Sequence, residues 1–265
     1  PASLLIGCLV LLSAGGMIYG IVLGQQTQVD VRAARVSKGG DVRVEDRRVD
    51  ERKLGVRYLL EDDHVRQRVI LTGEGALPWD LLIGKALMPE EDHLWRVLLV
   101  GGGASTLPRI LREERTAVTI EVLERTGAVV ELGRDYFDTE LRSGSTERES
   151  VRIGNLEDLL ADLQGPFDLV IVDTSALAPL GGSSALSKLA HTKLLSVLGT
   201  SGVIAWGPTA PDIGTVGAPE GWRQMTFTRS RDSEEEVIVL SQLGGGDLLD
   251  VSFAGFRLIS GSDLP

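Results

Sequence analysis

The sequence predicts an α/β fold in which a mostly parallel sheet carries helices on both faces. From residue 95 onward, short apolar runs alternate with stretches that have the spacing of helices. Strands that are apolar on both faces are typical of a parallel sheet covered by helices. Two alternating segments before residue 72 predict a small β region ahead of this sheet, and residues 2–23 predict one N-terminal transmembrane helix.

Composition narrows the classes of function. The 265 residues suffice for one sizeable domain and an appendage, and 43% of them are hydrophobic and 25% charged, as in ordinary globular proteins. A net charge of -11 argues against a nucleic-acid binder, which needs a basic face. Cys8 is the one cysteine, so no disulfide can form within the chain. The three histidines show no metal-ligand spacing, and we expect no metal site.

Residues 2–23 contain no charged side chain. A helix of this length rises about 33 Å, close to the thickness of a bilayer's hydrocarbon core. A cleaved signal peptide would have a basic start and a shorter apolar core, so an anchor is favoured. Basic residues follow the span and predict a cytoplasmic domain with the N-terminus outside. They are Arg32, Arg35, Lys38, Arg43, Arg47 and Arg48.

One face of the predicted span is built from glycine. Gly16, Gly20 and Gly24 are four residues apart, so they lie on one side of a helix. Glycine lets a second helix backbone approach closely, which predicts helix packing and partners among other membrane proteins, with the lipid bilayer around them. The alternative is that glycine is simply common in membrane spans.

The pattern divides the chain into five segments. Residues 1–24 form the transmembrane helix, 25–40 a linker, 41–94 a β-hairpin region with an entry helix at 76–88, 95–243 the main domain, and 244–265 a tail without assigned structure. The hairpin strands are expected at 54–60 and 64–71. An antiparallel pair at 222–231 and 234–243 closes the main sheet.

The main domain should place its chemistry at one edge. Strands are expected at 96–100, 117–124, 151–154, 167–175 and 202–207, and helices at 107–114, 126–137, 156–164 and 184–199. Ligands of such sheets bind beyond the carboxyl ends of the strands. The residues predicted there are 101–106, Glu124, 154–155 and 173–176.

These loops together resemble the spermidine synthase family, the polyamine aminopropyltransferases. That family has a Rossmann-like, class I S-adenosylmethionine-dependent methyltransferase-type fold with a small N-terminal β region. Its motifs are an apolar strand leading to Gly-Gly-Gly-Asp-Gly-Gly and an Arg, a strand ending in Glu-Val-Asp, and a helix ending near Arg-x-Tyr-Phe. The resemblance covers residues 54–207 and, more weakly, continues to 243. The positions in register are Gly101, Gly102, Gly103, Arg109, Glu124, Val130, Glu131, Arg134 and Tyr136.

The resemblance implies a set of site residues. Gly101, Gly103, Glu124 and Asn155 would bind the cofactor, with Glu124 on the ribose hydroxyls and Asn155 at the family's adenine-side Asp. Asp173 would serve as the catalytic base or amine anchor. The sequence favours no bound cofactor; the resemblance leaves decarboxylated S-adenosylmethionine, S-adenosylmethionine or methylthioadenosine as the alternatives. Two structural alternatives stay open, because a tight strand–helix turn needs glycine without any ligand and an acid at a strand end also caps the next turn.

The chain departs from the family where charge matters. Ala104 replaces the acid of the glycine loop, Ser105 and Thr106 replace its next two glycines, and Ala176 replaces the second acid of the catalytic segment. Three further positions differ: Thr126 stands at an acid of the family, residues 78–80 (Pro-Trp-Asp) at its Tyr-His-Glu, and His191 at a Tyr. Residues 63–67 (DHVRQ), in contrast, resemble the family's Asp-Gly-x-x-Gln.

Aminopropyl transfer depends on such carboxylates. The attacking amine is protonated at neutral pH, so a carboxylate must take its proton while others hold the remaining charge in line. Each missing charged contact costs about 2–3 kcal/mol, and three or more are missing. We therefore expect an inactive, membrane-anchored accessory or structural subunit of a membrane complex. The alternative is an active aminopropyltransferase or methyltransferase acting on an unidentified amine.

Overall fold

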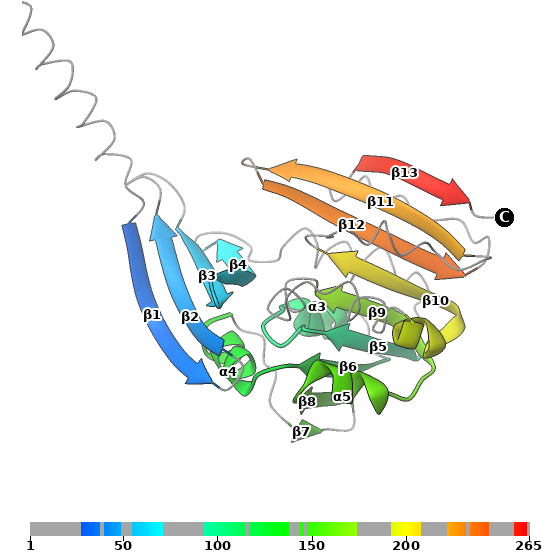
Figure 1. Cartoon of the computed structure of the whole chain (residues 1–265), viewed down its shortest axis with the longest axis horizontal. Helices are drawn as coiled ribbons and strands as arrows, with labels where there is room; N and C mark the ends of the chain where they lie inside the picture. The colour runs from blue at the N-terminus through cyan, green and yellow to red at the C-terminus, as the bar shows by residue number, and fades with distance from the viewer. Residues whose placement is uncertain are drawn as a thin grey trace, which may run out of the picture.

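The computed structural model contains two sheets that lie side by side (Figure 1). A four-stranded sheet comes first in the chain and a nine-stranded sheet follows. The predicted α/β fold, with a parallel sheet preceded by an antiparallel β region, is confirmed. The structure describes residues 28–37, 40–48, 55–70, 93–114, 117–137, 144–145, 148–173, 192–207, 222–231, 234–243 and 257–263.

The N-terminal sheet is a meander of four antiparallel strands. Its strands are β1 (Gln28–Ser37), β2 (Gly40–Arg48), β3 (Val56–Glu61) and β4 (His64–Ile70), paired in chain order. The predicted hairpin at 54–60 and 64–71 is confirmed as β3 and β4. The predicted linker at 25–40 is wrong over β1. Charged residues (Asp30, Arg32 and Arg35) are interspersed with its apolar ones, as in a strand at the edge of a sheet, where solvent reaches both faces.

The turn between β3 and β4 is hydrogen-bonded to the start of the neighbouring strand β2. Asp62 and Asp63 both have positive φ, of 48° and 67°, as the two loop residues of a type I′ hairpin do. Asp62 Oδ1 accepts a hydrogen bond from the Asp41 backbone N–H at 2.9 Å, and the Asp62 N–H donates to the Asp41 carbonyl. The hairpin is therefore fixed to the start of β2.

The larger sheet has a parallel centre and antiparallel margins. Its order is β13-β11-β12-β10-β9-β5-β6-β8-β7. The parallel strands are β5 (Trp95–Val100), β6 (Val118–Glu124), β8 (Glu149–Ile153), β9 (Phe167–Asp173) and β10 (Leu198–Gly207). The chain leaves β5 in one direction toward β6 and β8 and returns on its other side with β9 and β10, so the switch point lies between β5 and β9.

The margins of this sheet are antiparallel strands. The short β7 (Gly144–Ser145) pairs with β8 at one end. The predicted antiparallel pair near the other end is confirmed as β11 (Trp222–Arg231) and β12 (Glu234–Leu243). The tail, to which the sequence assigned no structure, contributes β13 (Arg257–Asp263) beside β11.

Three helices follow three of the parallel strands as the sequence predicts. They are α3 (Leu107–Glu114), α4 (Gly127–Phe137) and α5 (Leu156–Ala161). Residues 192–196 are also helical, but Leu198 and Gly199 already belong to β10, so the predicted helix at 184–199 extends too far. The helical spacing of apolar residues in the sequence does not show that Leu198 pairs with β9 as the first residue of a strand.

Helix α4 joins the two sheets. Val129, Leu132 and Phe137 on this helix form one buried cluster with Val42 and Leu59 of the N-terminal sheet. On the larger sheet, leucines of α5 pack in a second cluster with residues of β5, β9 and β10. Because α4 shares its apolar face with β2 and β3, the N-terminal sheet is held against the main domain by burial as well as by polar contacts.

Asp46 on β2 reinforces this contact. Its side chain is 3% exposed and accepts hydrogen bonds from Arg57 Nε at 2.7 Å and Arg32 Nε at 2.7 Å. Arg57 also donates to the Tyr136 carbonyl of α4 and lies over the Tyr136 ring. The hydrogen bonds from Arg57 and Arg32 outweigh the cost of burial and lower the pKa of Asp46.

Within the part of the chain that the structure describes, no helix is long and apolar enough to cross a membrane. The predicted transmembrane helix, its glycines Gly16, Gly20 and Gly24, and the predicted entry helix at 76–88 lie outside the described residues.

We predict that Asp46→Asn lowers the free energy of unfolding by about 1–2 kcal/mol at pH 7, because Arg57 loses its buried partner. A carboxyl group whose pKa is lowered by folding stabilises above its unfolded pKa of about 3.9 and stops doing so as pH falls through the folded value. The gap between wild type and variant should therefore narrow below about pH 4. Urea unfolding of the full chain in mild detergent at several pH values measures both effects.

Asp135→Asn is the matched control, because Asp135 pairs with Arg134 on the exposed side of α4. It should change the free energy of unfolding by less than about 0.5 kcal/mol. Equal effects of the two substitutions would contradict the structural role given to Asp46.

Candidate functional site

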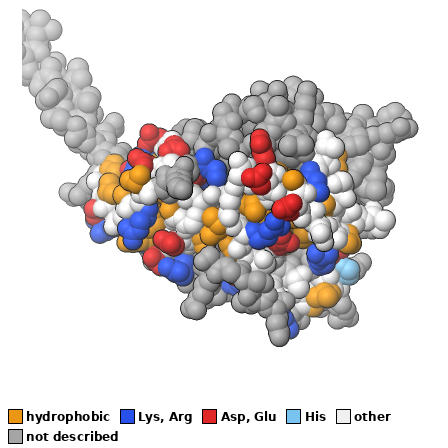
Figure 2. All heavy atoms as spheres, turned by 60° about the horizontal axis from the view of Figure 1, so that its bottom comes forward, with side chains coloured by type: hydrophobic (Ala, Val, Ile, Leu, Met, Phe, Trp, Pro, Cys, Tyr) orange, Lys and Arg blue, Asp and Glu red, His pale blue; other side chains and the backbone are white. Residues whose placement is uncertain are grey.

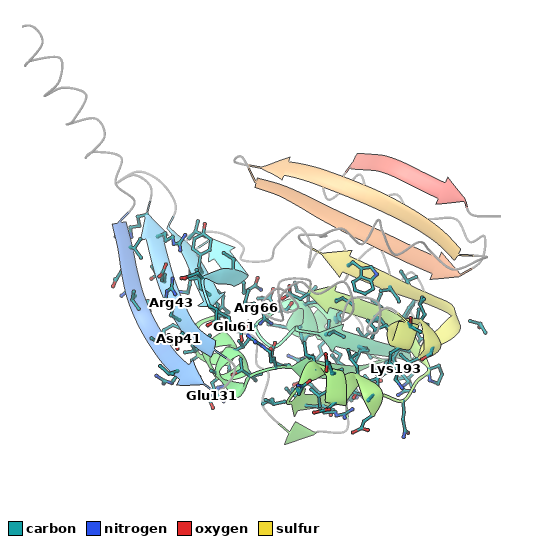
Figure 3. The ribbon with its side chains drawn as sticks, in the orientation of Figure 1. Asp41, Arg43, Glu61, Arg66, Glu131 and Lys193 are labelled. Atoms are coloured by element: carbon teal, nitrogen blue, oxygen red, sulfur yellow. The ribbon has the colours of Figure 1, made fainter. Side chains whose placement is uncertain are left out.

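The carboxyl ends of β5, β6 and β9 meet the hairpin of the N-terminal sheet. Gly101 follows β5, Glu124 ends β6 and Asp173 ends β9. Arg66 reaches this edge from β4, and Glu61 from the end of β3. Figure 3 shows Glu61 and Arg66 at the junction of the two sheets. This is the edge at which the sequence predicts a ligand site.

Arg66 lies at the centre of the junction with a fully buried side chain. Its Nη1 donates to Glu61 Oε2, and its Nη2 donates to Glu124 Oε2 at 3.1 Å and to the Gly101 carbonyl at 3.0 Å. Its Nε lies 3.8 Å from Asp173 Oδ2. Burial disfavours the charged guanidinium, but the charges of Glu124, Asp173 and Glu61 outweigh it and raise the pKa of Arg66. Arg66 is therefore a permanent positive charge at this edge.

Glu61 extends the network to a second arginine. Its side chain is fully buried, and its Oε1 accepts a hydrogen bond from Arg125 Nη2 at 2.5 Å. Arg125 Nη2 also lies 3.9 Å from Asp62 Oδ2 in the hairpin turn. We call Glu61, Arg66, Glu124, Arg125 and Asp173 the Arg66 cluster. The cluster contains three carboxylates and two arginines, so its formal net charge is -1.

Glu124 has no exposed surface, which excludes a solvated acid at the strand end. Its Oε2 accepts from Arg66 and from the Gly103 backbone N–H at 3.1 Å. Its Oε1 accepts from the Arg125 N–H at 2.7 Å. Both oxygens of the predicted ribose-binding carboxylate are thus hydrogen-bonded within the protein.

The glycine turn is shaped by Glu124 and by α4. Gly101 has a φ of +82°, a conformation that favours glycine. A Cβ on Gly103 would lie 2.8 Å from Glu124 Cγ, and a Cβ on Gly133 would lie 2.8 Å from the Gly103 carbonyl oxygen. The chain therefore needs Gly101, Gly103 and Gly133 for its own packing, whatever else binds there.

Ala104, which the sequence resemblance aligns with an acid of the glycine loop, has apolar surroundings. It is 2% exposed and packs in the cluster of Val42, Val44 and Leu132. A carboxylate at this position would be buried among aliphatic side chains at a cost of several kcal/mol. An uncharged residue at position 104 fits the apolar contact between the N-terminal sheet and α4.

Three other polar positions near this edge serve as caps. Ser105 Oγ accepts from the Leu107 N–H at the start of α3, and Thr126 Oγ1 from the Ala128 N–H at the start of α4. Asn155, predicted to bind a cofactor, accepts from the Glu157 N–H at 2.8 Å and caps α5. Its amide is exposed and outside the Arg66 cluster. Each side chain has a structural role that its residue type favours.

The structure brings together four of the predicted site residues: Gly101, Gly103, Glu124 and Asp173. Asp173 has an 18% exposed side chain and borders Gly207 on β10. Positions 78–80, Ala176 and His191 lie outside the described residues. Sequence reasoning missed Glu61, Arg66 and Arg125, which come from the hairpin and from the residue after Glu124.

Comparison with solved structures finds the fold of spermidine synthases. The spermidine synthase from Thermotoga maritima superposes with a TM-score of 0.61 at 17% identity, over 84% of this chain and 75% of that one. A spermidine synthase in complex with the transition state analogue AdoDATO gives 0.59 at 16% identity, over 84% and 74% of the two chains. No family model and no curated protein sequence matches this chain. At this identity the likeness shows the fold alone.

We predict that Arg66→Met lowers the free energy of unfolding by about 3–5 kcal/mol, because it leaves Glu61 and Glu124 buried without their shared cation. Chemical denaturation of the full chain in mild detergent measures the loss. The control is the triple variant Arg66→Met, Glu61→Gln, Glu124→Gln, which removes Arg66 together with its two hydrogen-bonded carboxylates and should lose less stability than Arg66→Met alone. Wild-type stability of Arg66→Met would contradict the network.

We also predict that Gly103→Ala costs about 1–3 kcal/mol of unfolding free energy, because the added methyl group meets Glu124 and Val130 at 3.0 Å or less. Gly154→Ala is the matched control in the neighbouring loop, where the nearest atoms to an added Cβ are 3.7 Å away. The same denaturation experiment compares the two. A larger loss at Gly154 than at Gly103 would show that the turn is packed differently.

Proposed function

We propose that this chain is a membrane-anchored, spermidine-synthase-like protein without transferase activity that serves as an accessory or structural subunit of a membrane protein complex. The observation that carries the proposal is the buried guanidinium of Arg66 among Glu61, Glu124 and Asp173. The carboxylates that the resemblance assigns to a cationic cofactor and an amine are paired with a cation of the chain itself.

Charge at the strand ends supports the loss of amine binding. A polyamine or an aminopropyl group would need carboxylates free to pair with ammonium groups. Arg66 is tethered to the same carboxylates and is fully buried, so a ligand would have to displace it and strand its charge. Arg66 and Arg125 together leave only one of the cluster's three carboxylate charges without an offsetting cation. This weakens binding of the substrates that a spermidine synthase is named for.

The hairpin turn supports the same conclusion. The family motif near this turn is Asp-Gly-x-x-Gln, and Asp-Gly is a preferred dipeptide for a two-residue loop with positive φ at both positions. Those loop positions are Asp62 and Asp63 in this chain. Counting from Asp62 rather than from Asp63, the residue at the motif's Gln is Arg66. In this alignment Arg66, which pairs with Glu61 and Glu124, takes the place of the motif's neutral Gln side chain.

Membrane anchoring rests on the sequence. Residues 2–23 carry no charge, basic residues follow them, and Gly16, Gly20 and Gly24 share one face. This pattern supports a single-pass protein with an outside N-terminus, a cytoplasmic domain and partners among other membrane proteins. An inactive domain with such an anchor fits a role in assembly.

An active aminopropyltransferase, or a methyltransferase acting on an unidentified amine, is the second candidate. It is favoured by the place of Glu124 and Asp173, which both end strands beside the switch point of the sheet, where ligands of such folds bind. In this candidate function, Arg66 would have to leave its carboxylates when the cofactor enters.

Calorimetric titration with S-adenosylmethionine, decarboxylated S-adenosylmethionine and methylthioadenosine separates the two candidates. We predict no saturable heat with any of the three at up to about millimolar ligand, because the site's charges are already paired. A spermidine synthase titrated under the same conditions is the positive control. Saturable binding followed by turnover of a polyamine would contradict the proposal and favour the transferase.

The accessory role has its own test. We expect other membrane proteins to co-purify with the full chain in mild detergent and to be lost from a Gly20→Leu variant, which blocks close helix approach. Ile21→Leu, one position along the same segment, should keep them. A monodisperse species that contains this chain alone would contradict a complex.

A further inference from the structure

Strand β1 forms the outer edge of the N-terminal sheet. It pairs with β2 on one side, and among the described residues no strand pairs with its other side. An edge strand presents a row of backbone N–H and C=O groups that can pair with another strand. In Figure 1, β1 lies at the opposite end of the molecule from β13, and Figure 3 shows Arg66 and Glu61 on the side of the N-terminal sheet that faces the main sheet, away from β1.

One face of β1 is apolar and exposed. Val29, Val31 and Val36 are 50%, 54% and 88% exposed, and Ala34 is exposed as well. Residues directly opposite in an antiparallel pair share a face. The four lie opposite Arg47, Glu45, Asp41 and Arg43 of β2, and the bulge between Val31 and Ala33 keeps them on that one face. Figure 2 shows hydrophobic side chains beside charged ones on this part of the surface, at the left.

The other face of β1 carries opposite charges at matched positions. Asp30 lies opposite Asp46 and Arg35 opposite Val42, so both are on the face that turns toward α4. The Asp30 side chain is 55% exposed and pairs with Arg32 at 3.1 Å. Arg35 is exposed and donates to the Ala34 carbonyl. Asp30 and Arg35 are placed symmetrically about the point between Arg32 and Ala33.

We propose that β1 pairs antiparallel with β1 of a second copy of this chain, about a two-fold axis between Arg32 and Ala33. In this register Val29 lies opposite Val36, Val31 opposite Ala34, and Asp30 opposite Arg35, and the symmetry makes each contact twice. Apolar side chains meet apolar ones on one face and opposite charges meet on the other, which stabilises cross-strand pairs. The two N-terminal sheets become one continuous sheet.

The charges also select this register. A shift of two residues that brings Val31 opposite Val36 would place Arg32 opposite Arg35, and like charges in direct opposition are unfavourable. The pairing rests on β1 alone and is independent of the proposed function. It uses neither the Arg66 cluster nor the glycines of the predicted span.

A charge-swap experiment tests the register. Sedimentation of the full chain in mild detergent should show a dimer, and Arg35→Asp should raise its dissociation constant about tenfold or more, because two attractive pairs become repulsive. The double variant D30R/R35D should restore the dimer, since it exchanges the partners. Arg134→Asp, on the exposed side of α4, should leave the dimer unchanged, and circular dichroism checks that each variant folds.

Cysteine cross-linking gives a second readout that does not depend on charge. In a Cys8→Ser background, the V29C/V36C variant should form a disulfide-linked dimer under mild oxidation, because directly opposite residues have the Cα spacing that a disulfide requires. V29C alone should not, since the two copies of residue 29 are about 23 Å apart along the ladder.

Three results would overturn the pairing. They are a monomer at every concentration tested, a dimer that tolerates Arg35→Asp, and equal cross-linking of V29C and V29C/V36C. A dimer formed through the glycines of the predicted span would give the second result.

Discussion

The pairing of the buried Arg66 with Glu61 and Glu124 is the interaction on which this structure depends most. A guanidinium with no exposed surface is costly unless its charge is matched, and here the groups that accept hydrogen bonds from its two Nη atoms come from several separate elements. Glu61 comes from β3, Glu124 from β6, and the Gly101 carbonyl from the turn after β5. The N-terminal sheet thus completes the edge of the main sheet by supplying the charge that this edge needs.

The backbone of this site has the arrangement of a ligand-binding fold, but the pairing of Arg66 with Glu61 and Glu124 determines what its side chains can bind. The strand, the glycine turn and the helix have the arrangement of nucleotide-type folds, and the similarity to solved spermidine synthases extends over most of the chain. In this chain the acids of the site are paired internally, because Glu124 accepts hydrogen bonds from Arg66, Gly103 and Arg125. A shared fold leaves function open, so the proposal rests on these side chains.

Much of the fold could be predicted because its signals are local. The apolar strands, the glycine after β5 and the alternation of β3 and β4 each follow from a few consecutive residues. Strand β1 was missed because an edge strand with Asp30, Arg32 and Arg35 has the composition of a linker. The end of the fourth helix was misjudged because pairing of β10 with β9 through Leu198 is a long-range contact.

The central side chain of the site could not be predicted from its own strand. Arg66 and Gln67 are adjacent, yet they are only 6% and 5% exposed, so β4 does not simply alternate there. The register of β3 and β4 shifts between Leu59 and Leu60, and this irregularity lets neighbouring side chains both be buried. One signal was present in the sequence: two acids at the carboxyl ends of strands, Glu124 and Asp173, require a cation if no ligand supplies one.

An experimental density map of the full chain, determined with millimolar decarboxylated S-adenosylmethionine present, tests the central claim most directly. The account predicts density for the Arg66 guanidinium between Glu61 and Glu124 and no nucleoside beside Glu124. A nucleoside whose ribose is hydrogen-bonded to Glu124, with Arg66 displaced from the carboxylates, would contradict it.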